Sequence, residues 1–234
     1  TLHGLTGHNT ALGVSVRKDL RDFYDSCDND GKGMYHKTIE LLLEKGSFQR
    51  DPLFYPAKNP EFIVSDDFAD GLFGKGRSLS ATEIISISFN MKKNIMAKTL
   101  SIAFSQVAQS KEVRKFFSDS EKTADQQIQT FAQIMHKDNL PIPRSWESEV
   151  TTSTEAPFSD KLMMYHTGFL FQAAQVYHGT GLASAMRTDL ITTYESIILK
   201  NLMVTKKWFD IMTKNRWLEQ PPLAPNRKEL ADGN

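Results

Sequence analysis

An internal repeat at a fixed offset of 170 residues constrains the fold of this chain more than any other feature. Residues 8–53 align with residues 178–223 without a gap, and 11 of the 46 aligned pairs are identical. Chance would give roughly three identities at a background of about 6% per position. Because a repeat of this length copies a structural unit, we expect the chain to contain two related units.

The periodicity of the second unit predicts four helices of about 25 residues each. The first begins at a capping box, in which the side chains of Ser80 and Glu83 satisfy backbone amides reciprocally. The second is expected over about 111–137, the third after the N-cap residue Ser159, and the fourth up to the prolines at 221–222. No segment has the alternation of a strand. The long connection between the second and third helices favours two packed α-hairpins.

The register of the repeat predicts how the chain is divided. Thr1 aligns with Phe171, in the middle of a helix, so we expect a fragment that lacks roughly 90 residues of the first unit. The two helices that remain should expose apolar faces, which would dock on the second unit or pair with another chain. The predicted parts are the C-terminal half of a first four-helix unit at 1–56, a linker at 57–79, a complete four-helix bundle at 80–223 and a tail at 224–234.

The composition excludes several classes of protein. The 28 lysines and arginines balance 28 aspartates and glutamates, so no net charge attracts the chain to nucleic acid or to an anionic membrane. The single cysteine, Cys27, excludes an internal disulfide framework and a cysteine-based zinc site. No apolar run reaches the roughly 20 residues of a membrane span, and there is no signal-peptide pattern. We therefore expect a soluble, cytoplasmic protein with no nucleic-acid partner.

No catalytic residue can be named from the sequence. No Ser/His/Asp or Cys/His set is readable, and Cys27 has no activating context. Four-helix bundles commonly hold carboxylate-bridged metals, which require Glu-x-x-His pairs, and no such pair occurs in this chain. Candidate ligands for iron or manganese in a non-standard arrangement are Glu121, His166 and Glu195, although each of them also fits a structural role.

The repeat retains three polar residues in each copy. They are His8, Arg17 and Asp19 in the first copy and His178, Arg187 and Asp189 in the second. An arginine and an acid that flank a helix junction most simply form a capping or inter-helix ion pair, and a ligand contact is the functional alternative. We expect the structural role.

Four short strings together carry a family resemblance. They are Pro141-Ile142-Pro143, Ala156-Pro157-Phe158-Ser159-Asp160, Arg187-Thr188-Asp189-Leu190 and Trp217-Leu218-Glu219-Gln220-Pro221-Pro222. The combination resembles an uncharacterised family of spore-forming Gram-positive bacteria, catalogued as domain of unknown function 3231. The resemblance implies an all-α fold of tandem ferritin-like four-helix bundles, here one complete bundle plus a truncated second copy of two helices. It brings no activity and no catalytic residue, and it implies a spore association by analogy alone.

Three functions remain open at this point. The leading hypothesis is a non-enzymatic structural or interaction protein without a cofactor, which self-associates or binds a protein partner through the truncated unit. The alternative is a ferritin-like metal-binding protein or oxidase that uses Glu121, His166 and Glu195. The second alternative is a binder of a small apolar ligand between the helices.

Overall fold

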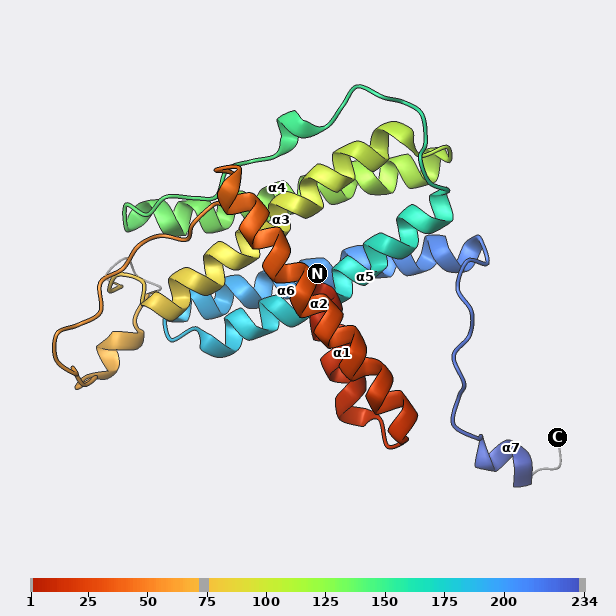
Figure 1. Cartoon of the computed structure of the whole chain (residues 1–234), viewed down its shortest axis with the longest axis horizontal. Coiled ribbons are helices and arrows are strands. Elements are labelled where there is room, and N and C mark those ends of the chain that lie inside the picture. Colours follow the sequence, from red (N-terminus) through yellow and green to blue (C-terminus); the bar gives the residue numbers. More distant parts are fainter. Residues whose placement is uncertain (1, 72–75, 232–234) are drawn as a thin grey trace.

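The computed structural model describes residues 2–71 and 76–231, and in this part of the chain all regular structure is helical (Figure 1). The all-α class predicted from the sequence is therefore confirmed. The helices are α1 (Leu2–Val14), α2 (Lys18–Glu44), α3 (Ala81–Val107), α4 (Lys111–Lys137), α5 (Asp160–Ser184), α6 (Thr188–Lys214) and α7 (Arg227–Ala231), with 3-10 turns η1 (Asp66–Ala69) and η2 (Glu147–Glu149). Residues 72–75 of the predicted linker and 232–234 of the predicted tail lie outside the described part.

Helices α3 to α6 form a four-helix bundle. Short junctions join α3 to α4 and α5 to α6, so each pair is an antiparallel hairpin. The two hairpins pack on each other through α3 against α5 and α4 against α6. The long connection between α4 and α5 runs along the outside of the bundle and carries η2 (Figure 1). Two packed α-hairpins are the arrangement that the connection lengths favour.

Local sequence sets the ends of these helices. At the start of α3 the Ser80 hydroxyl accepts from the Glu83 amide at 3.4 Å, and the Glu83 carboxylate accepts from the Ser80 amide at 2.8 Å. This is the predicted capping box. At the start of α5 the Ser159 hydroxyl accepts from the Leu162 amide. Helix α4 ends where Asn139 takes a φ of 55°, a left-handed conformation that Asn adopts more readily than most residues.

Two apolar clusters make up the core of the bundle, one toward each end. The cluster near the start of α3 and the end of α4 includes Ile87, Met91, Phe131, Met135 and Leu190. The cluster near the α3–α4 junction includes Phe104, Val113, Phe117, Met164 and Met212. Between them, the four helices contribute buried polar and small side chains, so the core is interrupted at its middle by a polar layer.

Helices α1 and α2 form a third hairpin, which crosses the bundle at an angle and extends beyond it (Figure 1). On α1, His3 Nδ1 lies 2.8 Å from the Tyr177 hydroxyl of α5. After α2, the Asp51 carboxylate accepts from Ser88 and Lys92 of α3 at 2.5 and 2.7 Å. Helices α2 and α6 each contain 27 residues, and their bounds differ by the offset of the sequence repeat.

Candidate functional site

A pocket lies in the middle of the four-helix bundle, between the two apolar clusters. Its cavity volume is about 50 Å³, room for roughly three or four ordered waters at about 10–15 Å³ each. All four bundle helices line it, and α1 contributes His3. Bundle cores of this kind are where such folds hold ligands and cofactors, so this pocket is the candidate site.

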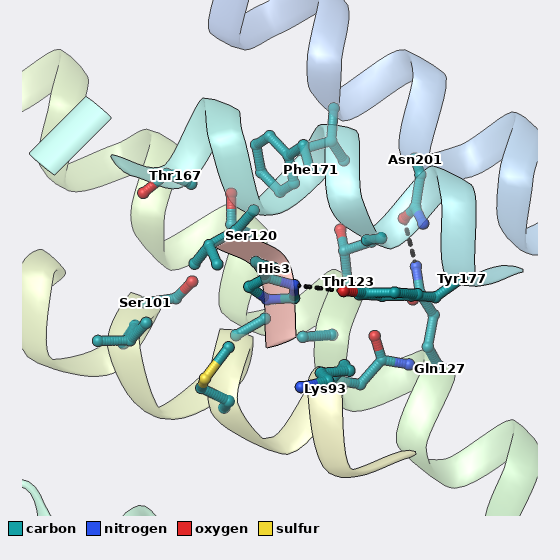
Figure 2. A pocket seen from close by; sticks show the side chains of 18 residues that line it. His3, Lys93, Ser101, Ser120, Thr123, Gln127, Thr167, Phe171, Tyr177 and Asn201 are labelled. Atoms are coloured by element: carbon teal, nitrogen blue, oxygen red, sulfur yellow. Dashed lines mark hydrogen bonds between the residues drawn. The ribbon is translucent and has the colours of Figure 1, made fainter. Parts of the chain in front are cut away.

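Hydroxyl and amide side chains supply most of the polar lining. The hydroxyl groups belong to Ser101, Ser120, Thr123 and Thr167, and two of the amides belong to Gln127 and Asn201 (Figure 2). The third amide belongs to Asn94. No aspartate or glutamate is found among the described residues that line the pocket. A divalent cation would therefore find no carboxylate here to balance its charge, and the lining suits a neutral or anionic guest better.

Part of this polar layer is connected across three helices. The Gln127 side-chain amide donates to Asn201 Oδ1 at 2.6 Å, and Asn201 Nδ2 lies 3.3 Å from His178 Nδ1. Burial lowers the pKa of His178 to about 4, so its imidazole is neutral at pH 7. The repeat counterpart of this histidine has a different neighbour, because His8 Nδ1 lies 3.7 Å from the carboxylate of Asp28.

Two polar groups in the lining have no hydrogen-bond partner among the described residues. They are Asn94 Nδ2 and Ser120 Oγ, which are buried from solvent. Both residues are more than nine-tenths buried. A buried group left in this state costs about 1–3 kcal/mol. Because an amide nitrogen and a hydroxyl can both donate, the pocket offers two uncommitted donors to a guest.

One lysine lines the pocket without an acidic partner. Lys93 makes no ion pair with any described residue, and its ammonium lies 4.9 Å from the ring centroid of Phe89 and 5.9 Å from that of Tyr177. Burial, together with repulsion from Lys92, lowers the pKa of Lys93 below its ordinary value. Burial and the nearby Lys93 also lower the pKa of His3 to about 4. A neighbouring anion would favour the charged form of either group.

The structure does not bring the three predicted metal ligands together. His166 and Glu195 are exposed, and Glu121 is half-buried on α4. Among the described residues, no group of three or more His, Cys, Asp or Glu side chains could hold a metal ion. The inward position near Glu121 is filled by Ser120, because neighbouring residues differ by about 100° around a helix. The metal-binding alternative stays a prediction.

The polar layer was not predicted from the sequence. Each of its amide and hydroxyl residues, taken alone, fits the exposed surface of a helix. A signal for it exists in the spacing. Asn94 and Ser101 on α3 are seven residues apart, as are Ser120 and Gln127 on α4. Seven residues make nearly two helical turns, so the members of each pair face the same way. Polar pairs at this spacing within an apolar stripe mark the layer.

The retained pair Arg187 and Asp189 lies at the junction of α5 and α6. The Arg187 guanidinium donates to both Asp189 oxygens at 3.0 and 2.7 Å and to the Arg77 carbonyl at 2.7 Å. The Glu83 carboxylate accepts from the Arg77 guanidinium at 2.7 and 3.0 Å and from the amides of Met186 and Arg187. This network joins the linker, the start of α3 and the α5–α6 junction.

Arg17 and Asp19 form the same pair at the α1–α2 junction, in a different environment. Arg17 donates to the two Asp19 oxygens at 3.1 and 2.6 Å. Its side chain is 73% exposed, whereas the side chain of Arg187 is 7% exposed. The Arg–Asp ion pair is therefore repeated at both helix junctions. The residues that bury Arg187 in the bundle have no counterpart around Arg17 among the described residues.

A column of residues on α2 is also left uncovered, and we name it the α2 seam. Its members are seven residues apart: Leu20, Cys27, Met34 and Leu41. The repeat counterparts on α6 are Leu190, Ile197, Val204 and Ile211, which face the interior of the bundle. Leu20 is 40% exposed against 0% for Leu190, and Leu41 is 49% exposed against 8% for Ile211. The α2 seam is thus an apolar surface without a described partner.

Comparison with known proteins finds one matching family and a solved structure with a similar fold. The family model described as "Protein of unknown function (DUF3231)" matches residues 1–59 and 67–230. A solved structure described as a "putative spore coat protein" from Bacillus halodurans C-125 matches with a TM-score of 0.58 and 11% identity, over 64% of this chain and 98% of that chain. At this identity the likeness concerns the fold alone. No curated protein matches the chain.

In the described part of the chain, no helix combines the length and the apolar character that crossing a membrane requires. The family match extends over nearly the whole chain, in agreement with the resemblance seen in the sequence. The chain therefore belongs to the family described as Protein of unknown function (DUF3231).

Proposed function

We propose that this protein is a non-enzymatic interaction protein that pairs with a second copy of itself through the α2 seam. The observation that carries the proposal is the exposure of Leu20, Met34 and Leu41 on α2. Their counterparts on α6 are buried or, for Val204, half-buried. Apolar surface of this kind is uncommon on a monomer and marks an interaction site. The α2 seam gives the protein a surface that the bundle itself does not use.

The spacing of the α2 seam favours another helix as its occupant. A seven-residue repeat of apolar positions keeps one stripe of a helix facing a neighbouring helix along its whole length. In an antiparallel pair of α2 helices, Leu20 of one chain would lie opposite Leu41 of the other, and Cys27 opposite Met34. A twofold axis buries both columns at once, because each surface then faces its own copy. The second copy is therefore the occupant that we propose.

A spore setting for this assembly is supported by the structural neighbour. That protein is described as a "putative spore coat protein", and the fold is shared at low identity. Fold likeness alone does not carry function, so the support is analogy. Self-association of identical chains agrees with a structural role of this kind.

Sedimentation equilibrium over a wide concentration range tests the proposal. The chain should form a dimer, and Leu20→Asp combined with Leu41→Asp should leave a monomer, because the charges cannot be buried in the seam. Leu199→Asp combined with Leu202→Asp is the matched control, since both leucines are exposed on α6. A chain that stays monomeric at every concentration, or a seam variant that dimerises like the control, would overturn the proposal.

The single cysteine provides a second measurement on the dimer. Cys27 lies in the α2 seam and is the only cysteine of the chain, so a spin label can be attached without mutagenesis. In the antiparallel pair the two labels start about 10 Å apart along the helix axis, with helices about 8–10 Å apart. Strong dipolar coupling between the labels is expected, and a dimer without it would contradict pairing through α2.

A further inference from the structure

The uncommitted groups of the central pocket share one chemical property: each can donate a hydrogen bond. Asn94 Nδ2 and Ser120 Oγ are buried without partners, and Lys93 lines the same pocket without an acidic neighbour. No carboxylate is present among the described lining residues to accept from them. The pocket thus has three donors, one of them cationic, and no carboxylate that accepts from them. This favours a guest that carries an anionic oxygen.

The rest of the lining restricts the guest further. Leu100, Leu170, Phe171 and Val204 give the pocket an apolar wall. A purely apolar guest would leave the buried donors unpaired, at a cost of about 1–3 kcal/mol for each. An inorganic anion would satisfy the donors and leave the apolar wall uncovered. A guest with a carboxylate at one end and an aliphatic chain at the other satisfies both parts.

The size of the cavity limits the length of that chain. The cavity volume of about 50 Å³ corresponds to roughly three or four waters, which a carboxylate of about three to five carbons would replace. Longer chains would have to displace side chains of a packed core. The guest is therefore small, and a membrane lipid or a long fatty acid does not fit.

Access to the pocket involves α1. His3 Nδ1 lies 2.8 Å from the Tyr177 hydroxyl, and both residues line the pocket (Figure 2). No residue of α1 is buried. Opening this side of the pocket requires only the loss of a few partly exposed contacts, which is the kind of local opening that occurs at low cost.

From these observations we infer that the pocket at the centre of the bundle binds a short-chain carboxylate. The carboxylate group faces Lys93 and accepts from the buried donors, and the aliphatic chain lies against Leu100 and Phe171. This inference is independent of the self-association proposed above, because the pocket is inside the bundle and shares no residue with the α2 seam.

Isothermal titration calorimetry with three guests of equal chain length tests the inference. Butyrate, 1-butanol and n-butylamine are titrated into the full chain at constant ionic strength in chloride. Butyrate should bind with one-to-one stoichiometry and at least about tenfold more tightly than 1-butanol, while butylamine should not bind. Equal binding of butyrate and 1-butanol, or no binding of butyrate, would overturn the inference. Acetate is titrated as a shorter fourth guest, and acetate binding as tight as that of butyrate would show a simple anion site and also overturn the inference.

Two neighbouring lysines supply a matched pair of variants. Lys93→Met should weaken butyrate binding at least about tenfold, whereas Lys92→Met should change it much less, because Lys92 does not line the pocket and pairs with Asp51. Ser120→Ala removes one buried donor with a minimal change of shape, and it should weaken butyrate binding and leave 1-butanol binding as it is. Unaltered butyrate binding by both Lys93→Met and Ser120→Ala would refute the assignment. Circular dichroism confirms that each variant is folded.

Discussion

The carboxylate of Glu83 receives hydrogen bonds from the linker, from the start of α3 and from the α5–α6 junction. Burial alone would raise its pKa, but the Arg77 guanidinium and the amides of Ser80 and Met186 outweigh burial and lower the pKa to about 2. A buried polar network stabilises a fold only while all its members are satisfied. Glu83 is therefore a structural residue, although a buried carboxylate with a shifted pKa can also mark a reactive site.

Replacing this carboxylate should destabilise the protein strongly. Glu83→Gln removes the charge that pairs with Arg77 and leaves part of a buried network unsatisfied, so we expect the free energy of unfolding to fall by about 3–5 kcal/mol. Urea unfolding at pH 7 measures the change. Glu112→Gln is the control, because Glu112 pairs with Lys214 on the surface and should alter stability by less than about 1 kcal/mol. Similar losses in the two variants would contradict the role given to Glu83.

Glu83 should also make the free energy of unfolding depend on pH in the acid range. Its folded pKa of about 2 lies below its ordinary value of 4.5. The stabilisation is therefore fully present above pH 4.5, and it is lost as the pH falls from 4.5 toward 2, because the unfolded chain then binds the proton first. A difference of this size is worth about 3 kcal/mol. Urea unfolding between pH 5 and pH 2 should show this loss in the natural chain, and Glu83→Gln should lack it.

His178 should produce a second loss of stability, in a higher pH range. Burial lowers its pKa from 6.5 to about 4. Stability is complete above pH 6.5 and falls between pH 6.5 and pH 4, since the unfolded state takes up a proton that the folded state excludes. The expected loss is about 3 kcal/mol. His178→Gln should reduce the slope over this range and leave the part that His3 contributes, whereas His136→Gln, an exposed change on α4, should leave the slope unchanged. Equal slopes in both variants would show that His178 does not titrate as stated.

At the scale of the helices, the approach of α5 to α6 depends on two glycines. A Cβ at Gly168 would lie within van der Waals overlap of the Trp208 ring, and one at Gly181 would overlap the Tyr194 ring at 2.5 Å. Gly179 lies on the same helix with open space around it. This contrast explains why a helix can keep glycine in its interior despite the cost in helix propensity.

The contrast between these glycines can be measured. Gly168→Ala and Gly181→Ala should each lower the free energy of unfolding by about 1–3 kcal/mol, because the aromatic rings must move within a packed core. Gly179→Ala should raise it by about 0.5–1 kcal/mol, because alanine favours the helix and meets no neighbour. Thermal and urea unfolding of the three variants distinguish the cases. A destabilising Gly179→Ala would show that its surface is covered in solution.

Helix bounds were predictable from sequence, and the interior of the bundle was not. The bounds of α3 and α4 follow from local chemistry, such as the capping box at Ser80 and the prolines after α4, which act without tertiary contacts. The inward face of a helix depends instead on packing, and an error of one residue rotates the assignment by about 100°. Ser120 therefore takes the inward position on α4, and its neighbour Glu121, a candidate ligand from the sequence, does not. The angle at which α1 and α2 cross the bundle has no local signal either.

At the scale of the whole molecule, stability is concentrated in one part of the chain. Both apolar clusters belong to α3–α6 and the residues next to them. Helix α1 has no buried residue, and Asp28 is the only buried residue of α2. The first hairpin contacts the bundle through His3, which meets Tyr177, and the segment after it contacts the bundle through Asp51, which pairs with Lys92. A large apolar core resists opening and a small interface does not, so the two parts should differ in dynamics.

This difference predicts how the molecule opens and what can be removed from it. Amide hydrogens of α1 and α2 should exchange much faster than those of α3–α6 at concentrations too low for self-association, as hydrogen exchange with mass spectrometry would show.

Deleting residues 1–56 should leave a cooperatively unfolding, helical chain, because the deletion removes no residue of either apolar cluster. The loss of the docking contacts should cost about 1–2 kcal/mol. A deletion variant without a cooperative transition would mean that the first hairpin is part of the folding unit, and equal exchange across all helices would lead to the same conclusion.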